Sequence, residues 1–306
     1  MRIAVMGTGG VGGYFGGRLA EAGEDVSFVA RGAHLQAMQS RGLAIRSGVG
    51  DTTLTPVQAT DDPAALGTVD LVLFTVKLYD TESAADVIRP LIGPNTGVVT
   101  FQNGITGTET LTRTLGIEHV LGGVAKIAAV IGEPGVIHHT GTMADLVFGE
   151  LDGRTTDRVE ALARALQAAG VQHAFSDRIG DEIWYKMVLL STFSGITSLL
   201  RLPVGPIRSD PETRALLTDG LAEALAVARA AGAALTNRSV DDLLLQIDRM
   251  PAEMKASMLG DLERGRRLEL PWLSGTIARL GREHGVATPV HGLITTALKL
   301  HQDGSR

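Results

Sequence analysis

The sequence predicts an α/β protein in which an N-terminal Rossmann-type parallel sheet, with helices on both faces, precedes an all-α C-terminal domain. In the first half of the chain, short Val-rich runs bounded by turn residues alternate with helical stretches, a pattern typical of βαβ units. From Asp177 onward only helical patterns follow. Because 306 residues exceed what one hydrophobic core usually organises, we expect two domains, residues 1–177 and residues 178–306.

The parallel sheet is predicted from apolar runs that suit buried strands. Its expected strands are Arg2–Met6, Val26–Ala30, Val69–Val76 and Gly97–Phe101, with a shorter edge strand over Asp51–Val57. The helices expected between them are Gly10–Ala22, Ala33–Arg41, Thr81–Leu91 and Gly107–Leu115. Beyond them we expect three strands, a helix and a last strand over Val120–Val130, Val136–His139, Asp145–Gly149, Thr155–Ala169 and Gln172–Ser176.

The second half predicts a set of packed helices. They are expected over Asp181–Leu200, Pro211–Ala231, Val240–Met250, Glu253–Arg264, Pro271–Gly285 and Pro289–His301. Three of these begin with proline, which the first turn of a helix tolerates. If the chain stays helical through Pro251, then Met250, Met254 and Met258 form one stripe, which favours core packing.

Composition excludes several classes of protein. The net charge of −6 offers no footprint for nucleic acid or for an anionic membrane. The chain has no cysteine, and therefore no disulfide, thiolate metal site or cysteine nucleophile. The apolar run Val188–Leu200 is too short to span a bilayer, and the scattered histidines predict no metal site. We expect a cytoplasmic protein, and the sequence leaves open whether it forms a homodimer.

A glycine-rich turn, Gly7-x-Gly9-x-x-Gly12, stands between the first predicted strand and the first predicted helix. In this setting Gly7 permits a tight turn, Gly9 lets the backbone approach a pyrophosphate, and Gly12 lets the helix pack closely on the strand. The phosphates would bind the N–H groups at the start of the helix. The alternative is a plain strand–helix turn, because three glycines at this spacing arise easily in a chain with 38 of them.

The end of the second predicted strand distinguishes between the two nicotinamide dinucleotides. NAD is usually recognised there by a carboxylate that accepts a hydrogen bond from the ribose 2′-hydroxyl. Here the strand ends at Ala30-Arg31, and Asp25 lies at its other end. The guanidinium of Arg31 suits a 2′-phosphate, and His34 lies close by in the sequence. These residues favour NADP(H), the alternative being that Arg31 is a solvated loop arginine.

Short motifs spread along the chain resemble those of the ketopantoate reductase family. In chain order they are Gly7-Thr8-Gly9-Gly10-Val11-Gly12, Arg31, Thr75-Val76-Lys77, Asn103-Gly104, Trp184-x-Lys186 and Glu269. The resemblance extends through Asp303 and implies an NADPH-dependent reductase that converts 2-dehydropantoate to pantoate. It also implies that the whole glycine motif, Arg31, Lys77 and Asn103 bind the cofactor.

The resemblance further implies four roles around the substrate. Asn103 would lie beside the nicotinamide and the substrate, Ser257 would contact the substrate, Lys186 would be the catalytic acid, and Glu269 would anchor the substrate hydroxyl. Hydride delivery to a ketone leaves negative charge on oxygen, and a proton donor such as Lys186 lowers that barrier. Each residue also has a structural alternative: a turn for Asn103, an ordinary helix position for Ser257, a surface lysine for Lys186, and a helix N-terminal carboxylate for Glu269.

Two positions depart from the family pattern. Family members usually carry asparagine four and eight residues after the catalytic lysine, where this chain has Leu190 and Ser194. These two residues share a helix face with Lys186 and would form one wall of the substrate pocket. Because Leu190 cannot hydrogen-bond a carboxylate or hydroxyl, a different and less polar ketone is an alternative to 2-dehydropantoate. An NADP-binding sensor without turnover is the alternative from another class.

Overall fold

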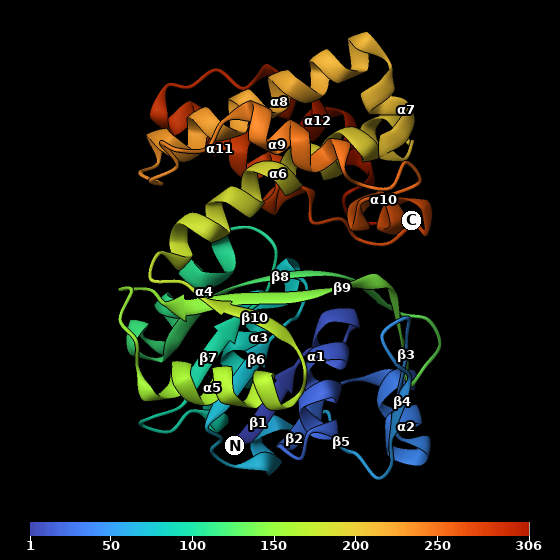
Figure 1. Cartoon of the computed structure of the whole chain (residues 1–306), viewed down its shortest axis with the longest axis vertical. Coiled ribbons are helices and arrows are strands. Elements are labelled where there is room, and N and C mark those ends of the chain that lie inside the picture. The colour runs from blue at the N-terminus through green and yellow to red at the C-terminus, as the bar shows by residue number, and fades with distance from the viewer. Residues whose placement is uncertain (306) are drawn as a thin grey trace. The chain divides into compact units, whose positions relative to one another are not determined.

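The computed structural model describes residues 1–305, which divide into two units (Figure 1). The α/β unit comprises Met1–Gln102 and Thr106–Glu182, and the helical unit comprises Asn103–Ile105 and the chain from Ile183 onward. The predicted fold class is confirmed, since a mostly parallel sheet with its helices is followed by helices alone. The division falls inside helix α6, and the domain boundary expected after residue 177 stays a prediction.

One mixed sheet organises the α/β unit. Its strands are β1 (Arg2–Met6), β2 (Asp25–Val29), β3 (Leu43–Ser47), β4 (Thr52–Leu54), β5 (Gln58–Thr60), β6 (Leu71–Phe74), β7 (Gly97–Thr100), β8 (Val120–Ile131), β9 (Val136–Glu150) and β10 (Gln172–Phe175). They follow the order β4-β3-β9-β8-β7-β6-β1-β2-β5, with β10 beside β9. The pairs β3–β4 and β8–β9 are antiparallel, whereas β2, β1, β6 and β7 run parallel to one another. The carboxyl ends of these four strands therefore meet at one edge.

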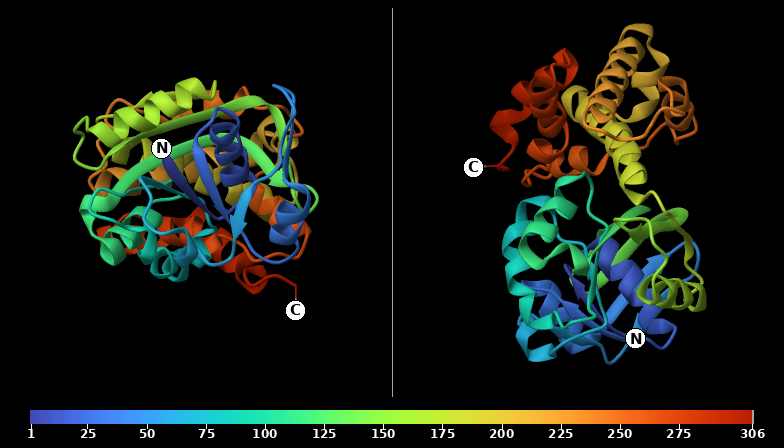
Figure 2. Two further views of the ribbon diagram at one scale, coloured as in Figure 1. Left: turned by 90° about the horizontal axis from the view of Figure 1, so that it is seen from below. Right: turned by 90° about the vertical axis from the view of Figure 1, so that its left-hand side faces the viewer.

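Helices cover both faces of the parallel strands, as Figure 2 shows from two sides. They are α1 (Gly10–Glu21), α2 (Gly32–Arg41), α3 (Thr81–Val87), α4 (Thr106–Leu115) and α5 (Asp157–Ala168). Ile3 of β1 packs in one apolar cluster with Phe15 of α1 and Leu162 of α5. The next residue, Ala4, faces the opposite way and packs with Leu111 of α4. Because side chains alternate along each strand, the strands contribute to two separate apolar layers, one on each face of the sheet.

Several predicted bounds in this unit are wrong. Strand β9 runs unbroken through the residues predicted as two strands, Val136–His139 and Asp145–Gly149. Helix α3 ends at Val87 rather than Leu91, and a 3-10 turn over Arg89–Leu91 follows it, because Pro90 has no N–H group to continue the α-helical hydrogen bonds. Strands β3 and β5 were not predicted, and each is a short strand near an edge of the sheet.

Helix α1 is held between two parts of the sheet by four glycines at paired i, i+4 positions. They are Gly12, Gly13, Gly16 and Gly17. A Cβ added to Gly16 would lie 2.6 Å from Val5 of β1, and one added to Gly17 would lie 2.6 Å from Ile45 of β3. Four other strands separate β1 from β3 in the sheet order. The sheet therefore curls around α1, and glycine is what lets both parts approach the helix.

The helical unit contains the second set of helices. They are α6 (Ile179–Leu200), α7 (Val204–Ser209), α8 (Pro211–Ala230), α9 (Val240–Asp248), α10 (Ser257–Glu263), α11 (Ser274–His284) and α12 (Pro289–Leu298). Pro211 and Pro289 occupy first helical positions, as predicted. Pro271 lies instead in a 3-10 turn, Leu270–Trp272, ahead of α11. The short helix α7 was not predicted.

The helix predicted over Glu253–Arg264 is wrong in its first turn. Helix α9 ends at Asp248 and α10 begins at Ser257, so no helix passes through Pro251. The methionine stripe that required such a helix does not form. Met258 is buried in the core, whereas Met250 and Met254 are half-buried outside any helix.

Helix α6 is the one helix in residues 1–305 that is long and apolar enough to cross a membrane, judged by length and composition alone. In the structure 67% of its most apolar window is buried. A core helix of a soluble protein has the same length, composition and burial. We therefore assign α6 to the protein core.

A buried polar cluster joins α8 to the start of α12. The carboxylate of Glu223 accepts the N–H groups of Val290 at 2.8 Å and His291 at 3.0 Å. The Nε2 atom of His291 lies 3.0 Å from the carbonyl oxygen of Gly220, while its Nδ1 atom is buried without a hydrogen-bond partner. Burial lowers the pKa of His291 to about 4 and raises the pKa of Glu223.

Candidate functional site

The glycine-rich turn lies at the carboxyl end of β1, where neighbouring segments hold it in place. Gly7 has φ +94°, a backbone conformation that glycine adopts readily. The N–H groups of Gly7 and Thr8 donate to the carbonyl oxygen of Val29 at 3.3 and 3.2 Å. The hydroxyl of Thr75 donates to the carbonyl oxygen of Gly7 at 2.7 Å. The ends of β1, β2 and β6 are therefore tied together around this turn.

The start of α1 can receive an anion. Gly9 is the N-cap residue, no side chain caps the helix, and its first turn carries no acidic residue. A Cβ added to Gly9 would meet no atom within 4 Å. The first N–H groups of a helix have no acceptor within it, and they lie at the positive end of the helix dipole. The turn thus fits a pyrophosphate, which could approach these N–H groups through the space beside Gly9.

Two further glycines of the motif are required by packing. A Cβ added to Gly12 would lie 2.8 Å from Val5, which is the close helix–strand approach that the motif predicts. A Cβ added to Gly10 would clash with the backbone carbonyl of Ala129, because β8 passes directly against the start of α1. Gly10 therefore has a structural role within the unit besides the cofactor contact predicted for it.

Arg31 and Lys77 lie at the same edge of the sheet as the glycine-rich turn. Arg31 follows β2 and its side chain is 84% exposed, yet one guanidinium nitrogen lies 2.7 Å from a carboxylate oxygen of Asp80. Lys77 follows β6 and is half-buried. His34 lies close to the glycine-rich turn: burial lowers its pKa, an interaction with the backbone of Thr8 partly opposes that effect, and its Nδ1 atom accepts the N–H of Gly135 at 3.0 Å. The cofactor roles of Arg31 and Lys77 stay predictions.

Gln102 organises this edge and was missed by the sequence reasoning. Its amide nitrogen donates to the carbonyl oxygen of Val76 at 2.9 Å and to the hydroxyl of Thr81 at 2.8 Å. Its amide oxygen accepts from the hydroxyl of Thr100 at 3.1 Å. One buried side chain thus joins the segments after β6 and β7, next to Lys77. The available signal was a polar residue directly after a buried strand.

In the helical unit, Lys186, Leu190 and Ser194 lie along one face of α6. Lys186 and Leu190 are half-buried, whereas Ser194 is fully buried and its hydroxyl has no hydrogen-bond partner. The face therefore passes from a partly accessible region into the core. In the pocket wall predicted from these two residues, Leu190 offers an apolar side chain, whereas Ser194 is buried in the core. The substrate contacts predicted for these residues stay predictions.

Glu269 is buried at the N-cap of the 3-10 turn that precedes α11. Its side chain does not cap that turn, so capping does not explain the carboxylate. At the end of the same segment, the hydroxyl of Ser274 donates to the carbonyl oxygen of Ser191 at 3.1 Å. The segment that carries Glu269 is therefore fixed to α6 five residues beyond Lys186 in the sequence.

The two remaining predicted residues differ in burial. Asn103 is half-buried, and the segment Asn103–Ile105 groups with the helical unit. Gly104 has φ +83°, so the predicted Asn-Gly turn is present. Ser257 is exposed as the first residue of α10. The structure leaves the roles predicted for Asn103 and Ser257 untested.

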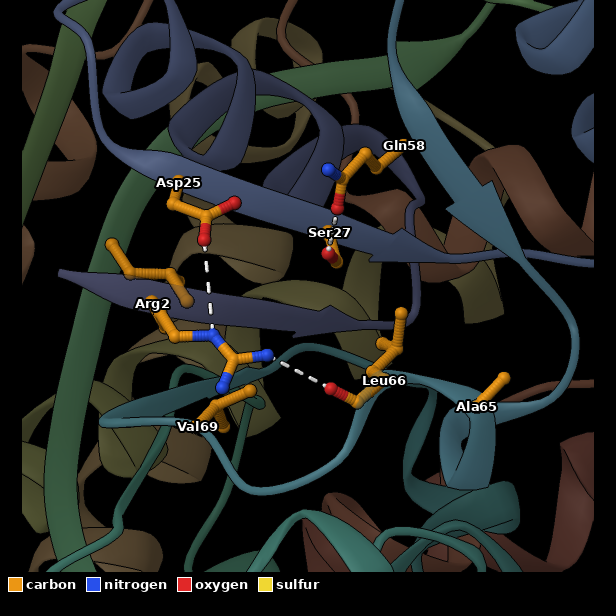
Figure 3. Close-up of a pocket in the computed structure, with 8 residues that line it drawn as sticks. Arg2, Asp25, Ser27, Gln58, Ala65, Leu66 and Val69 are labelled. Carbon is orange, nitrogen blue, oxygen red and sulfur yellow. Dashed lines mark hydrogen bonds and ion pairs between the residues drawn. The ribbon is translucent and has the colours of Figure 1, made fainter.

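A cavity of about 240 Å³ opens at the opposite, amino edge of the sheet (Figure 3). Its polar side chains are engaged with neighbours: Arg2 donates to the carbonyl of Leu66 at 2.9 Å, and Ser27 donates to Gln58 at 2.8 Å. Ligands of open α/β sheets bind at the carboxyl ends of the strands, so we do not take this cavity as the candidate site. Residues 1–305 contain no cluster of three or more histidines and carboxylates that could hold a metal ion.

Comparison with known families matches both parts of the chain. The profile described as "Ketopantoate reductase PanE/ApbA" matches residues 3–153. The profile described as "Ketopantoate reductase PanE/ApbA C terminal" matches residues 178–302. The two matches together cover most of the sequence in the order that the fold requires.

Individual relatives agree with these matches. A 2-dehydropantoate 2-reductase of Mesorhizobium japonicum is 34% identical to this chain over 94% of each protein. The crystal structure of a 2-dehydropantoate 2-reductase from Geobacter metallireducens is 36% identical and superposes with a TM-score of 0.92, covering 98% of this chain and 99% of that one. A D-mandelate dehydrogenase solved with NADH and anilino(oxo)acetate shares the fold, with a TM-score of 0.89 at 23% identity over 99% of this chain and 98% of that one.

Proposed function

Because the chain belongs to the ketopantoate reductase PanE/ApbA family of oxidoreductases, we propose that it reduces 2-dehydropantoate to pantoate with NADPH. Members of this family use a nicotinamide cofactor, which supplies the hydride when bound. The observation that carries the proposal is the uncapped start of α1 at the carboxyl edge of the sheet, beside an exposed Arg31 and with no carboxylate at the end of β2. We propose residues 1–177 and 178–306 as its domains and the cytoplasm as its compartment.

The cofactor would be held by the α/β unit. The N–H groups of Gly10, Val11 and Gly12 at the start of α1 would bind the pyrophosphate. Thr8 and Gly9 lie in the same turn, where the N–H of Gly9 donates to the carbonyl oxygen of Gly7 at 2.7 Å. The guanidinium of Arg31 would bind the 2′-phosphate, because a planar fork of N–H donors matches phosphate oxygens. Lys77 would contact the ribose or phosphates from the neighbouring strand end.

The helical unit would supply the proton. As a hydride reaches the carbonyl carbon, negative charge grows on the carbonyl oxygen, and the ammonium group of Lys186 would donate a proton to that oxygen to give the alcohol. Lys186 is half-buried on α6, and Glu182 lies one helical turn before it on the same face. Glu269 would accept a hydrogen bond from the substrate hydroxyl, and Asn103 and Ser257 would contact the substrate.

A less polar ketone is a second candidate substrate, and Leu190 is the residue that favours it. A leucine at this position offers no hydrogen bond to a polar substrate, and Ser194 is buried in the core. The related fold of D-mandelate dehydrogenase, solved with anilino(oxo)acetate, suggests the kind of aryl 2-oxo acid to test. A pocket built to hydrogen-bond a substrate rejects analogues that lack the polar group, whereas an apolar wall does not.

The experiment is an NADPH oxidation assay with 2-dehydropantoate, branched 2-oxo acids and phenylglyoxylate. We expect the highest kcat/KM for 2-dehydropantoate. A higher kcat/KM for phenylglyoxylate would contradict 2-dehydropantoate as the substrate but would leave the proposed NADPH-dependent ketone reduction standing. Tight NADPH binding with no turnover on any member would favour a sensor and contradict the enzymatic proposal. Light scattering on the same preparation tests whether the chain forms a homodimer.

A further inference from the structure

An ion pair joins the loops that follow β2 and β6 at the carboxyl edge of the sheet. Arg31 follows β2 and Asp80 lies beyond β6, and these two strands flank β1 in the sheet order. A guanidinium nitrogen of Arg31 lies 2.7 Å from a carboxylate oxygen of Asp80. The pair therefore joins the two loops on either side of the turn that follows β1. Both residues belong to the α/β unit, so this geometry is internal to one unit.

Asp80 forms this pair in place of a local contact that aspartate usually makes. It is the N-cap residue of α3, a position where an aspartate side chain normally accepts N–H groups of the first turn. In this structure the carboxylate makes no capping hydrogen bond. Its side chain is 28% exposed and directed to Arg31 instead.

We propose that Asp80 sets how strongly the protein prefers NADPH over NADH, by occupying the guanidinium of Arg31 that would otherwise receive the 2′-phosphate. The inference rests on the proposed function, in which Arg31 binds that phosphate. A 2′-phosphate and the carboxylate of Asp80 carry like charges and cannot share one guanidinium without repulsion. NADPH binding displaces the carboxylate of Asp80 from Arg31.

NADH can bind without displacing Asp80 from Arg31. Its ribose carries an uncharged 2′-hydroxyl, which leaves the ion pair in place. The binding of NADH therefore does not depend on breaking the pair between Arg31 and Asp80. The two residues together give an NADPH preference weaker than Arg31 alone would confer.

The test measures dissociation constants for NADPH and NADH by fluorescence titration on the full chain. The variants are Asp80→Asn, Arg31→Ala and, as a matched control, Glu82→Gln, which removes one exposed carboxylate from the same helix, where it pairs with Arg113. Asparagine keeps the N-cap preference, so α3 stays intact. We expect Asp80→Asn to tighten NADPH binding about two- to fivefold, the range for an exposed ion pair. NADH binding by Asp80→Asn, and both constants of Glu82→Gln, should stay close to wild type.

The outcomes distinguish a failure of the role of Asp80 from a failure of the role of Arg31 in binding the 2′-phosphate. If Arg31→Ala abolishes the preference for NADPH while Asp80→Asn leaves both constants unchanged, Asp80 plays no part and the proposed cofactor assignment stands. If Arg31→Ala leaves the NADPH/NADH ratio unchanged, Arg31 does not read the 2′-phosphate and both ideas are wrong. The gain of Asp80→Asn over wild type should shrink at high salt, because the effect is electrostatic at an exposed site. A salt-independent gain would contradict the charge mechanism.

Discussion

Acidification should destabilise the helical unit through one buried residue, His291. Its Nε2 atom faces the carbonyl oxygen of Gly220 at 3.0 Å and so carries the hydrogen, whereas Nδ1 is enclosed without a partner. A second proton would be placed on Nδ1, where nothing accepts it. Burial accordingly lowers the pKa of His291 from 6.5 to about 4.

The sign and size of the effect follow from this pKa. Between pH 6.5 and about 4 the unfolded chain binds the proton and the folded chain does not, so the free energy of unfolding falls as pH falls. Each pH unit costs about 1.4 kcal/mol in this window. The contribution of His291 is complete above pH 6.5 and, by about pH 4, roughly 3 kcal/mol has been lost.

The assay is urea unfolding at pH 7.5 and pH 5.0, followed by tryptophan fluorescence. Both tryptophans of the chain, Trp184 and Trp272, belong to the helical unit, so the signal reports on that unit. Wild type should lose about 2 kcal/mol more than His291→Gln between the two pH values. Glu223, whose pKa is raised by burial, is present in both proteins and cancels in the comparison. Parallel pH dependence in the two proteins would refute the assignment to His291.

Three further predictions concern the candidate site. Lys186→Ala should lower kcat about 10²- to 10⁴-fold with the Kd for NADPH within twofold of wild type, and a loss confined to cofactor affinity would contradict its role as acid. Gly10→Ala should lower the free energy of unfolding by about 1–3 kcal/mol, because β8 leaves no room for a Cβ atom there. Gly9→Ala should keep the stability of wild type and weaken NADPH binding. Thermal unfolding measures the first effect, and titration with NADPH measures the second. Gln102→Leu should destabilise the α/β unit by about 1–3 kcal/mol, since the carbonyl of Val76 loses its hydrogen-bond donor. The same variant should raise KM for NADPH more than it lowers kcat. Wild-type values of both KM and kcat would exclude a positioning role for Gln102.

The sequence predicted the parallel strands well because their apolar runs and the glycine-rich turn are local signals. It missed β3 and β5, since such short edge strands depend on partners far away in the sequence: β3 pairs with β9 and β5 with β2. The stripe of Met250, Met254 and Met258 was predicted only for a chain that stays helical through Pro251, and α9 ends before this proline, which interrupts helices. Periodicity must therefore yield to proline when the two disagree.

The site divides in the same way. The glycine motif, Arg31 and Lys186 stood out because each breaks a local pattern. Gln102 and Asp80 did not, because their importance comes from partners at the ends of other strands. The burial of Ser194 was also not predictable, since the spacing along α6 fixes which face a residue shares but not how deeply that face is covered.

The curl of the sheet around α1 limits how this protein can adapt to new ligands. Gly16 packs so closely on Val5, and Gly17 on Ile45, that neither position has room for a Cβ atom. The start of α1, where the phosphates would bind, is therefore held in a fixed position relative to the sheet. Adaptation to another dinucleotide must then proceed through the loops after β2 and β6, whose side chains can be exchanged while the axis of the helix stays still.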